Sequence, residues 1–316
     1  MKPKYKVMVS APYLLPVLDR FRPRFESHGV ELVVPQVNER LEEDELLPLV
    51  ADLDGVISGD DRFTARVLEA APRLKVIAKW GTGIDSIDQE ACRRRGITIC
   101  NTPGAFSEPV ADSVLGYILA FARRLPCMDR HMKQGSWEKI PGHSLGEAVL
   151  GVIGVGNVGK AVVRRARAFN MRVLGNDLKE MPPDFIAQTG IEMVDKPSLL
   201  AQVDYLSLNC DLNPTSHHLL NQETLALIKP GAVVINTARG PLVDEAALVR
   251  ALRQGRIAGA ALDVFEQEPL PPDSPLLGMD NVMLAPHNAN SSPRAWERVH
   301  QSTIDQLLAA LEAARP

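Results

Sequence analysis

Short runs of apolar, β-branched residues alternate with stretches of helical periodicity along almost the whole chain. Many of these runs are continuously apolar, which is typical of strands that helices cover on both faces. Repeated strand–helix–strand units predict parallel, doubly wound sheets, and two groups of runs predict two such sheets in an α/β protein. The first group of expected strands is 6–10, 31–35, 55–58, 76–79 and 97–100; the second is 149–154, 172–175, 191–194, 205–208, 232–237, 258–264 and 281–285.

Two long helices are expected beside these repeats. Residues 107–125 are apolar around most of the helical circumference, so this helix should be buried, between domains or between subunits. Pro126 should end it, and residues 127–146 lack a clear period and are expected to form an arm or linker. The last helix is predicted at 293–314.

Composition and charge narrow the function classes. The chain has 316 residues, 45% of them hydrophobic and 23% charged, as in a globular protein of about two domains. Its net charge of −4 gives no general attraction for nucleic acid or for an anionic membrane. The longest apolar stretch, 114–122, is less than half of the about 20 residues that a membrane span needs.

Targeting and metal signals are also weak. Pro12 and Pro16 interrupt the apolar run near the N-terminus, so a first strand at 5–10 is favoured over a secretory signal. None of the four cysteines forms a C-x-x-C pair, which is typical of reduced thiols in a cytoplasmic protein. No residue spacing predicts a metal site.

A glycine-rich loop carries the clearest chemical signal. Gly154, Gly156 and Gly159 form G-x-G-x-x-G directly after an expected strand and before a helix that continues through 160–169. Such glycines permit a tight turn, close approach to a pyrophosphate and close helix packing, and the helix N-terminus attracts phosphate. Asp177 follows the next strand, where an acid accepts hydrogen bonds from ribose hydroxyls. Together these features predict a dinucleotide site.

The same residues also match the beginning of a P-loop. Gly154, Gly159 and Lys160 have the spacing of G-x-x-x-x-G-K, but Ala161 stands where a P-loop needs a hydroxyl to hold magnesium. The nucleotide-triphosphatase interpretation is therefore disfavoured.

Three polar residues follow three successive expected strands. Arg239, Glu268 and His287 should lie at the carboxyl edge of one sheet, where doubly wound folds bind ligands. An arginine grips a carboxylate at two points, a histidine exchanges a proton near neutral pH, and a glutamate orients the ring. With a dinucleotide, these groups suit hydride transfer at the α-carbon of a 2-hydroxy acid. Each residue alone is more simply a loop or structural residue, and only their shared position favours a site.

The chain resembles the D-isomer-specific 2-hydroxyacid dehydrogenase family over nearly its whole length, and within it the phosphoglycerate-dehydrogenase-like members. The motifs that carry the resemblance are Lys79-Trp80-Gly81-Thr82-Gly83-Ile84-Asp85, the glycine loop with Asp177, Asn236-Thr237-Ala238-Arg239-Gly240, Ala261-Leu262-Asp263-Val264-Phe265 with Glu268-Pro269, and Pro286-His287.

The resemblance implies a two-domain architecture with the active site in the cleft between the domains. A discontinuous, flavodoxin-like substrate domain would comprise 1–101 and 289–316, and a Rossmann NAD domain 102–288. Arg239 would bind the substrate carboxylate and polarise its carbonyl, His287 would be the acid/base, and Glu268 its partner.

The resemblance also implies the remaining contacts. Backbone groups at Gly81, Thr82 and Gly83 would hold the substrate carboxylate, and the helix at 107–125 would build a homodimer. The positions expected to contact NAD, besides the glycine loop and Asp177, are Thr82, Asn157, Val158, Cys210, Thr237 and Asp263.

Some positions depart from the family pattern and leave the substrate open. Asn209-Cys210-Asp211 stands where His-x-Pro is common, Asn288-Ala289-Asn290 follows the histidine in place of small residues, and Trp80 replaces a small residue. Lys79 and Arg62 could receive a second anionic group, which would suit a phosphorylated acid such as 3-phosphoglycerate or its oxidised form. A surface ion pair of Arg62 with Asp60 and Asp61 is the simpler interpretation, and Trp80 could instead favour an apolar tail.

Two functions remain after this argument. The favoured one is an NAD-dependent dehydrogenase or reductase of 2-hydroxy and 2-oxo acids. The alternative is a non-catalytic, dinucleotide-sensing protein of the corepressor kind on the same fold, because a fold alone does not decide function.

Overall fold

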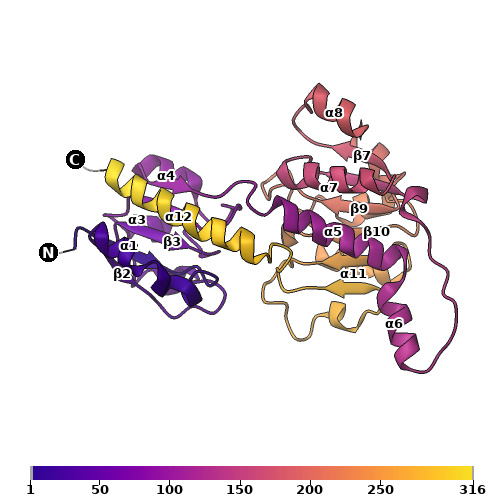
Figure 1. Cartoon of the computed structure of the whole chain (residues 1–316), viewed down its shortest axis with the longest axis horizontal. Coiled ribbons are helices and arrows are strands. Elements are labelled where there is room, and N and C mark those ends of the chain that lie inside the picture. Colours follow the sequence, from indigo (N-terminus) through magenta and orange to yellow (C-terminus); the bar gives the residue numbers. More distant parts are fainter. Residues whose placement is uncertain (1–2, 315–316) are drawn as a thin grey trace. The chain divides into compact units, whose positions relative to one another are not determined.

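The structure is a computed structural model that describes residues 3–314. The chain divides into two compact units (Figure 1). Unit 1 comprises Met1–Phe106 and Ser292–Pro316, and unit 2 comprises Ser107–Ser291.

Unit 1 is a parallel five-stranded sheet in the order β2-β1-β3-β4-β5, the order of flavodoxin-like folds. The long helix α12 packs against β3, β4 and β5, and Figure 1 shows it, in yellow, running along this unit. The strands are β1 (Tyr5–Val9), β2 (Val30–Val33), β3 (Gly55–Ser58), β4 (Val76–Lys79) and β5 (Thr98–Cys100); the helices are η1 (Leu15–Arg20), α1 (Arg22–Ser27), α2 (Glu43–Leu46), α3 (Ala65–Glu69), α4 (Gln89–Arg95) and α12 (Pro293–Ala313).

Unit 2 is a parallel seven-stranded sheet in the order β12-β11-β10-β9-β6-β7-β8. Its order reverses between β6 and β9, as in Rossmann folds, where dinucleotides bind. The strands are β6 (Val149–Ile153), β7 (Arg172–Asn176), β8 (Glu192–Met193), β9 (Tyr205–Leu208), β10 (Val233–Asn236), β11 (Gly259–Leu262) and β12 (Val282–Leu284); the helices are α5 (Ser107–Ala122), α6 (Leu125–Lys133), η2 (Leu145–Glu147), α7 (Asn157–Ala168), α8 (Pro183–Thr189), α9 (Lys196–Leu200), α10 (Gln222–Leu227), η3 (Gly240–Leu242), α11 (Glu245–Arg253) and η4 (Pro275–Gly278).

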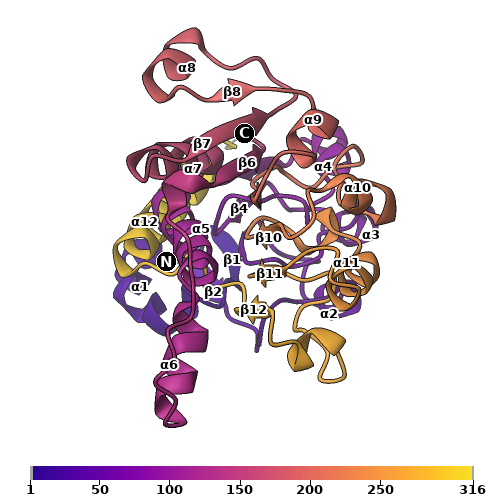
Figure 2. The ribbon, with the colours of Figure 1, turned by 90° about the vertical axis from the view of Figure 1, so that its right-hand side faces the viewer.

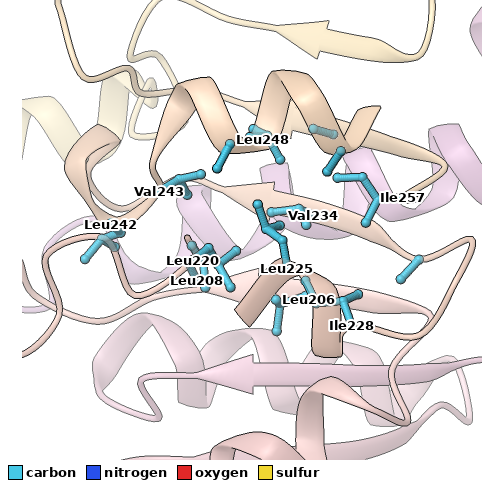
Figure 3. Packing of buried hydrophobic residues seen from close by; sticks show 14 of the residues in the cluster. Leu206, Leu208, Leu220, Leu225, Ile228, Val234, Leu242, Val243, Leu248 and Ile257 are labelled. Atoms are coloured by element: carbon cyan, nitrogen blue, oxygen red, sulfur yellow. The ribbon is translucent and has the colours of Figure 1, made fainter. Parts of the chain in front are cut away.

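Apolar layers lie on both faces of the unit 2 sheet. Figure 2 shows α5 and α7 on one side of the strands and α9, α10 and α11 on the other. The second layer is drawn in Figure 3, where Leu225 and Leu248 pack with strand residues Leu206 and Val234. This double covering explains why the strands are continuously apolar, and it confirms the two predicted α/β parallel-sheet folds.

Residues 127–146, expected to form an arm or linker, include most of a helix that was not predicted, because α6 begins at Leu125 and ends at Lys133. Arg124, with φ of 52°, interrupts the preceding helix, and Pro126 lies in the first turn of α6, where its missing N–H costs nothing. The sequence signal was weak because α6 has no buried residue. The expected helix at 107–125 ends earlier, at Ala122, and its buried side chains pack into the core of unit 2 itself.

Across residues 3–314, no helix has the combination of length and hydropathy that crossing a membrane requires. Within the same residues, His, Cys, Asp and Glu side chains form no group of three or more suited to a metal ion.

Candidate active site

The glycine-rich loop joins β6 to α7 and has the shape that a pyrophosphate needs. Gly154 has a φ of 86°, and a Cβ there would lie 2.5 Å from the backbone nitrogen of Cys210. A Cβ on Gly159 would lie 2.1 Å from the carbonyl oxygen of Gly154, so helix and loop are in direct contact. Gly156, by contrast, faces open space, and α7 begins at the next residue, Asn157. The loop therefore leaves room for a ligand at the positively polarised end of a 12-residue helix.

Asp177 lies directly after β7 and is tied to the glycine loop. Its Oδ2 accepts a hydrogen bond from the Val155 N–H at 2.7 Å, and its Oδ1 accepts one from the Lys179 N–H at 2.8 Å. Each carboxylate oxygen has a second lone pair, so both can still accept from a diol. This arrangement fits a ribose next to the loop.

Thr237 and Cys210 extend the same edge of the sheet. The hydroxyl of Thr237, after β10, is buried and has no hydrogen-bond partner among residues 3–314. An orphaned buried hydroxyl is costly, which is consistent with a ligand that completes it. Burial raises the pKa of the Cys210 thiol to about 11, so this residue is a neutral thiol at physiological pH. Val158 is partly buried against the core, and Asn157 is exposed at the start of α7.

Glu268 and His287 are brought together from the ends of β11 and β12. His287 Nδ1 lies 2.9 Å from Glu268 Oε2, and both side chains are about one-quarter exposed. The other carboxylate oxygen, Oε1, accepts a hydrogen bond from the Phe265 N–H at 2.9 Å. Because a carboxylate accepts, Nδ1 carries the hydrogen in this contact, and the ring presents Nε2 as its second functional atom.

Asp263 holds the backbone of the histidine loop. Its Oδ1 and Oδ2 accept hydrogen bonds from the N–H groups of Asn288 and Ala289, each at 2.8 Å, and its carbonyl accepts from His287 N–H at 2.8 Å. His287 itself has a φ of 50°, an uncommon value for a residue with a side chain. Burial raises the pKa of Asp263, while the nearby His287 opposes that rise. This supporting role was not predicted, because the family resemblance implies only a cofactor contact for Asp263.

Arg239 lies where β10 turns into η3. Its Nη1 donates to the Ala238 carbonyl at 2.8 Å, and the Asn236 amide donates to the Arg239 carbonyl at 2.8 Å. A Cβ on Gly240 would lie 1.8 Å from the Phe265 carbonyl oxygen, so the segments after β10 and β11 are in contact. Arg239, Glu268 and His287 therefore follow three adjacent parallel strands at one edge of the sheet, as the sequence predicted.

The loop after β4 in unit 1 contains the remaining predicted site residues. Gly81 has a φ of 130°, and its carbonyl accepts from both the backbone N–H and the hydroxyl of Thr102. Thr82 donates from its hydroxyl to the Thr102 carbonyl at 3.1 Å. The N–H groups of Gly81, Thr82 and Gly83 donate no hydrogen bond within the described residues, which suits an anion ligand.

Lys79, just before this loop, is buried and already paired. Its Nζ lies 2.9 Å from Asp60 Oδ1, and its side chain is only 5% exposed. Asp61 is buried as well, where it accepts hydrogen bonds from the Ser10 hydroxyl and the Leu41 N–H. The expectation that Asp60 and Asp61 form a surface ion pair with Arg62 is therefore wrong. Asp60 forms its ion pair with Lys79, and Asp61 is not at the surface.

Comparison with known proteins defines the class of this chain. The family model "D-isomer specific 2-hydroxyacid dehydrogenase, NAD binding domain" matches residues 115–289. The chain is 36% identical to a hydroxypyruvate reductase of Thermotoga maritima, over 98% of this chain and 99% of that protein. It is 40% identical to a glyoxylate reductase of Korarchaeum cryptofilum, over 84% of this chain and 81% of that protein. It is also 40% identical to a D-3-phosphoglycerate dehydrogenase of Methanocaldococcus jannaschii, of which it spans only 52%.

Among solved structures, a D-lactate dehydrogenase from Aquifex aeolicus, crystallised with NAD and lactic acid, is similar over 98% of this chain and 96% of that one. The identity is 27% and the TM-score 0.87.

This chain belongs to the D-isomer specific 2-hydroxyacid dehydrogenase family. It is an NAD-dependent oxidoreductase that acts on the hydroxyl-bearing carbon of 2-hydroxy acids. The comparisons do not favour the corepressor-like alternative.

Proposed function

We propose that the protein is an NADH-dependent reductase of small, unphosphorylated 2-oxo acids such as hydroxypyruvate and glyoxylate. The observation that carries the reaction is the His287–Glu268 pair, joined at 2.9 Å and supported by Asp263 at the sheet edge that also bears Arg239. The wild-type chain should oxidise NADH on addition of either acid, and no oxidation with any 2-oxo acid would refute the proposal.

We assign each step of the reaction to residues of this chain. When bound, the nicotinamide supplies the hydride that reaches the α-carbon of the acid. His287 donates a proton from Nε2 to the carbonyl oxygen, so that the C=O bond becomes C–OH, and the ring then takes a proton back from solvent. Glu268 accepts a hydrogen bond from Nδ1 and so holds the ring with Nε2 free for the transfer.

Arg239 orients the acid. A guanidinium donates two parallel hydrogen bonds to a carboxylate, which fixes the plane of the substrate and places its carbonyl near a positive charge. The N–H groups of Gly81, Thr82 and Gly83 form the second proposed carboxylate ligand. Asp177, the glycine loop and Thr237 are proposed to hold the dinucleotide, together with Thr82, Asn157, Val158, Cys210 and Asp263.

The far end of the substrate is proposed to be small and uncharged. A phosphate would need cations, but Lys79 is already neutralised by Asp60 and almost fully buried. The relatives that match the chain over most of their own length are hydroxypyruvate and glyoxylate reductases. The 40% identity to a phosphoglycerate dehydrogenase keeps the phosphorylated acid as a second candidate.

One assay separates these substrates. We expect kcat/KM for hydroxypyruvate to exceed that for 3-phosphohydroxypyruvate at fixed NADH. The Asp60→Asn variant frees Lys79 and should raise kcat/KM for the phosphorylated acid more than for hydroxypyruvate. A higher kcat/KM of the wild type for the phosphorylated acid would replace our proposal by the second candidate.

Two further proposals concern the setting of the enzyme. We propose a homodimer built through α5, and sedimentation velocity tests whether the protein is a dimer. We propose a cytoplasmic location, supported by four free cysteines, which cell fractionation tests.

A further inference from the structure

Five aromatic rings pack together in unit 1 just before the Gly81–Gly83 loop. Trp80, the residue that precedes the loop, is at their centre. Its ring centroid lies 5.3 Å from that of Tyr13, 5.7 Å from Phe106 and 5.6 Å from His300. Trp296 of α12 packs against Tyr13 in a tilted arrangement, with ring centroids 5.1 Å apart, and meets Trp80 edge-on at 6.4 Å.

One buried hydrogen bond ties this cluster to α12. The indole Nε1–H of Trp80 donates to His300 Nδ1 at 2.9 Å, and each residue is only 4% exposed. An indole N–H can only donate, so His300 must accept at Nδ1 and carry its hydrogen on Nε2. The contact therefore exists only while His300 is neutral.

The backbone of Trp80 is held as closely as its ring. Its N–H donates to the Ser58 carbonyl at 2.8 Å, and its carbonyl accepts from Lys79 Nζ at 3.4 Å. The next residue is Gly81, whose φ of 130° is a conformation that only glycine adopts readily. The first N–H group of the loop, that of Gly81, belongs to the same peptide group as the Trp80 carbonyl.

We propose that the Trp80–His300 pair is a positioning device for substrate binding: His300, on the C-terminal helix, fixes Trp80 and thereby aims the N–H groups of the Gly81–Gly83 loop at the substrate carboxylate. The inference rests on the proposed function, because it assumes that this loop binds the carboxylate. Neither residue touches the substrate, and each acts through the loop.

The pair also makes carboxylate binding sensitive to acid. Burial lowers the pKa of His300; Glu297, one turn earlier on α12, opposes this, and Arg20 at the end of η1 adds to it. These two charged groups form an ion pair with each other at 2.9 Å. Below the pKa of His300 the ring gains a proton at Nδ1 and loses its acceptor, so the loop is released.

Two substitutions at His300 distinguish positioning from mere packing. His300→Phe keeps a ring but removes the acceptor, whereas His300→Asn places an amide oxygen near the former Nδ1. We expect His300→Phe to raise KM for hydroxypyruvate about tenfold, with kcat and the Kd for NADH within about twofold of wild type. His300→Asn should restore KM at neutral pH and remove the rise in KM at acid pH that we expect for the wild type.

Indole N–H resonances provide a direct readout of the hydrogen bond. ¹⁵N-tryptophan labelling gives signals from Trp80, Trp137 and Trp296, and Trp80→Phe assigns the first of them. Trp137 is exposed and the Trp296 N–H is buried without an acceptor among the residues that the structure describes, so these two serve as internal references. The Trp80 signal should lie downfield, and it should move upfield in His300→Phe and, in the wild type, on acidification.

The outcomes separate the inference from the proposed function. The positioning role would be overturned if KM is unchanged in His300→Phe. It would also be overturned if KM rises as much in His300→Asn as in His300→Phe. If the wild type turns over no 2-oxo acid, the proposed function fails. The inference is then decided by calorimetric binding of oxamate with NADH: a Kd that His300→Phe raises supports it, and an unchanged or unmeasurable Kd overturns it.

Discussion

Replacing Asp263 by asparagine should reduce catalysis without loss of the fold. The two carboxylate oxygens accept hydrogen bonds from the N–H groups of Asn288 and Ala289, each at 2.8 Å, and these residues directly follow His287. An asparagine keeps one acceptor and turns an NH₂ group toward the other N–H. Loss of one hydrogen bond to a charged acceptor costs about 1.5–3 kcal/mol, so kcat should fall roughly 10- to 150-fold as the histidine loses its position.

Stability should respond differently to the same substitution. Burial raises the pKa of Asp263, so the folded state binds this proton more tightly than the unfolded state does. The contribution of the group to stability therefore falls as pH rises from its unfolded pKa, about 3.9, through its folded pKa, and it is unfavourable at neutral pH. Asp263→Asn removes that cost, so its Tm relative to wild type should improve between about pH 4 and pH 7.

The assay is steady-state NADH oxidation, combined with thermal unfolding at the two pH values. Asp204→Asn is the matched control, because Asp204 also accepts from a backbone N–H, that of Val149, but lies at the amino end of β9. An unchanged kcat in Asp263→Asn, or an equal loss in Asp204→Asn, would refute the reasoning.

Three further substitutions test the other parts of the site. Asp177→Ser should reduce the preference for NADH over NADPH at least about tenfold, because the carboxylate repels a 2′-phosphate. The preference is measured as the ratio of kcat/KM with the two cofactors, and an unchanged ratio would contradict the assignment of Asp177. Arg239→Lys should lower kcat/KM for the acid while the Kd for NADH, followed by fluorescence, stays nearly constant; loss of NADH binding alone would move Arg239 to a cofactor role. Thr237→Val removes a buried hydroxyl that has no hydrogen-bond partner within residues 3–314, so it should weaken NADH binding several-fold and leave Tm equal or higher. Unchanged binding would show that the hydroxyl does not contact the dinucleotide.

Most of the fold was predictable because its strands are buried on both faces. A strand such as Gly55–Ser58 is buried at every position, so its apolar run is visible without any alignment. Short helices such as Glu43–Leu46 carry too few residues for a helical period to show, and α6 has no buried face at all.

The contact between Glu268 and His287 was predictable for a topological reason. Parallel strands that are neighbours end at the same edge, so Glu268 and His287 meet although 19 residues separate them. Contacts that depend on side-chain direction were not predictable. The sequence offered Arg62 as the partner of Asp60, whereas the buried Lys79 occupies that position, and Trp80 finds its partner 220 residues away at His300.

The most direct test of the central claim is the turnover of hydroxypyruvate by wild type and by His287→Ala, followed by the loss of NADH absorbance. Positioned proton transfer contributes roughly 10²–10⁴-fold, so the account predicts that the variant loses most of kcat while it binds NADH as the wild type does. A variant that retained more than about one-tenth of the wild-type kcat would contradict the assignment of His287 as the acid/base, and with it the proposed mechanism.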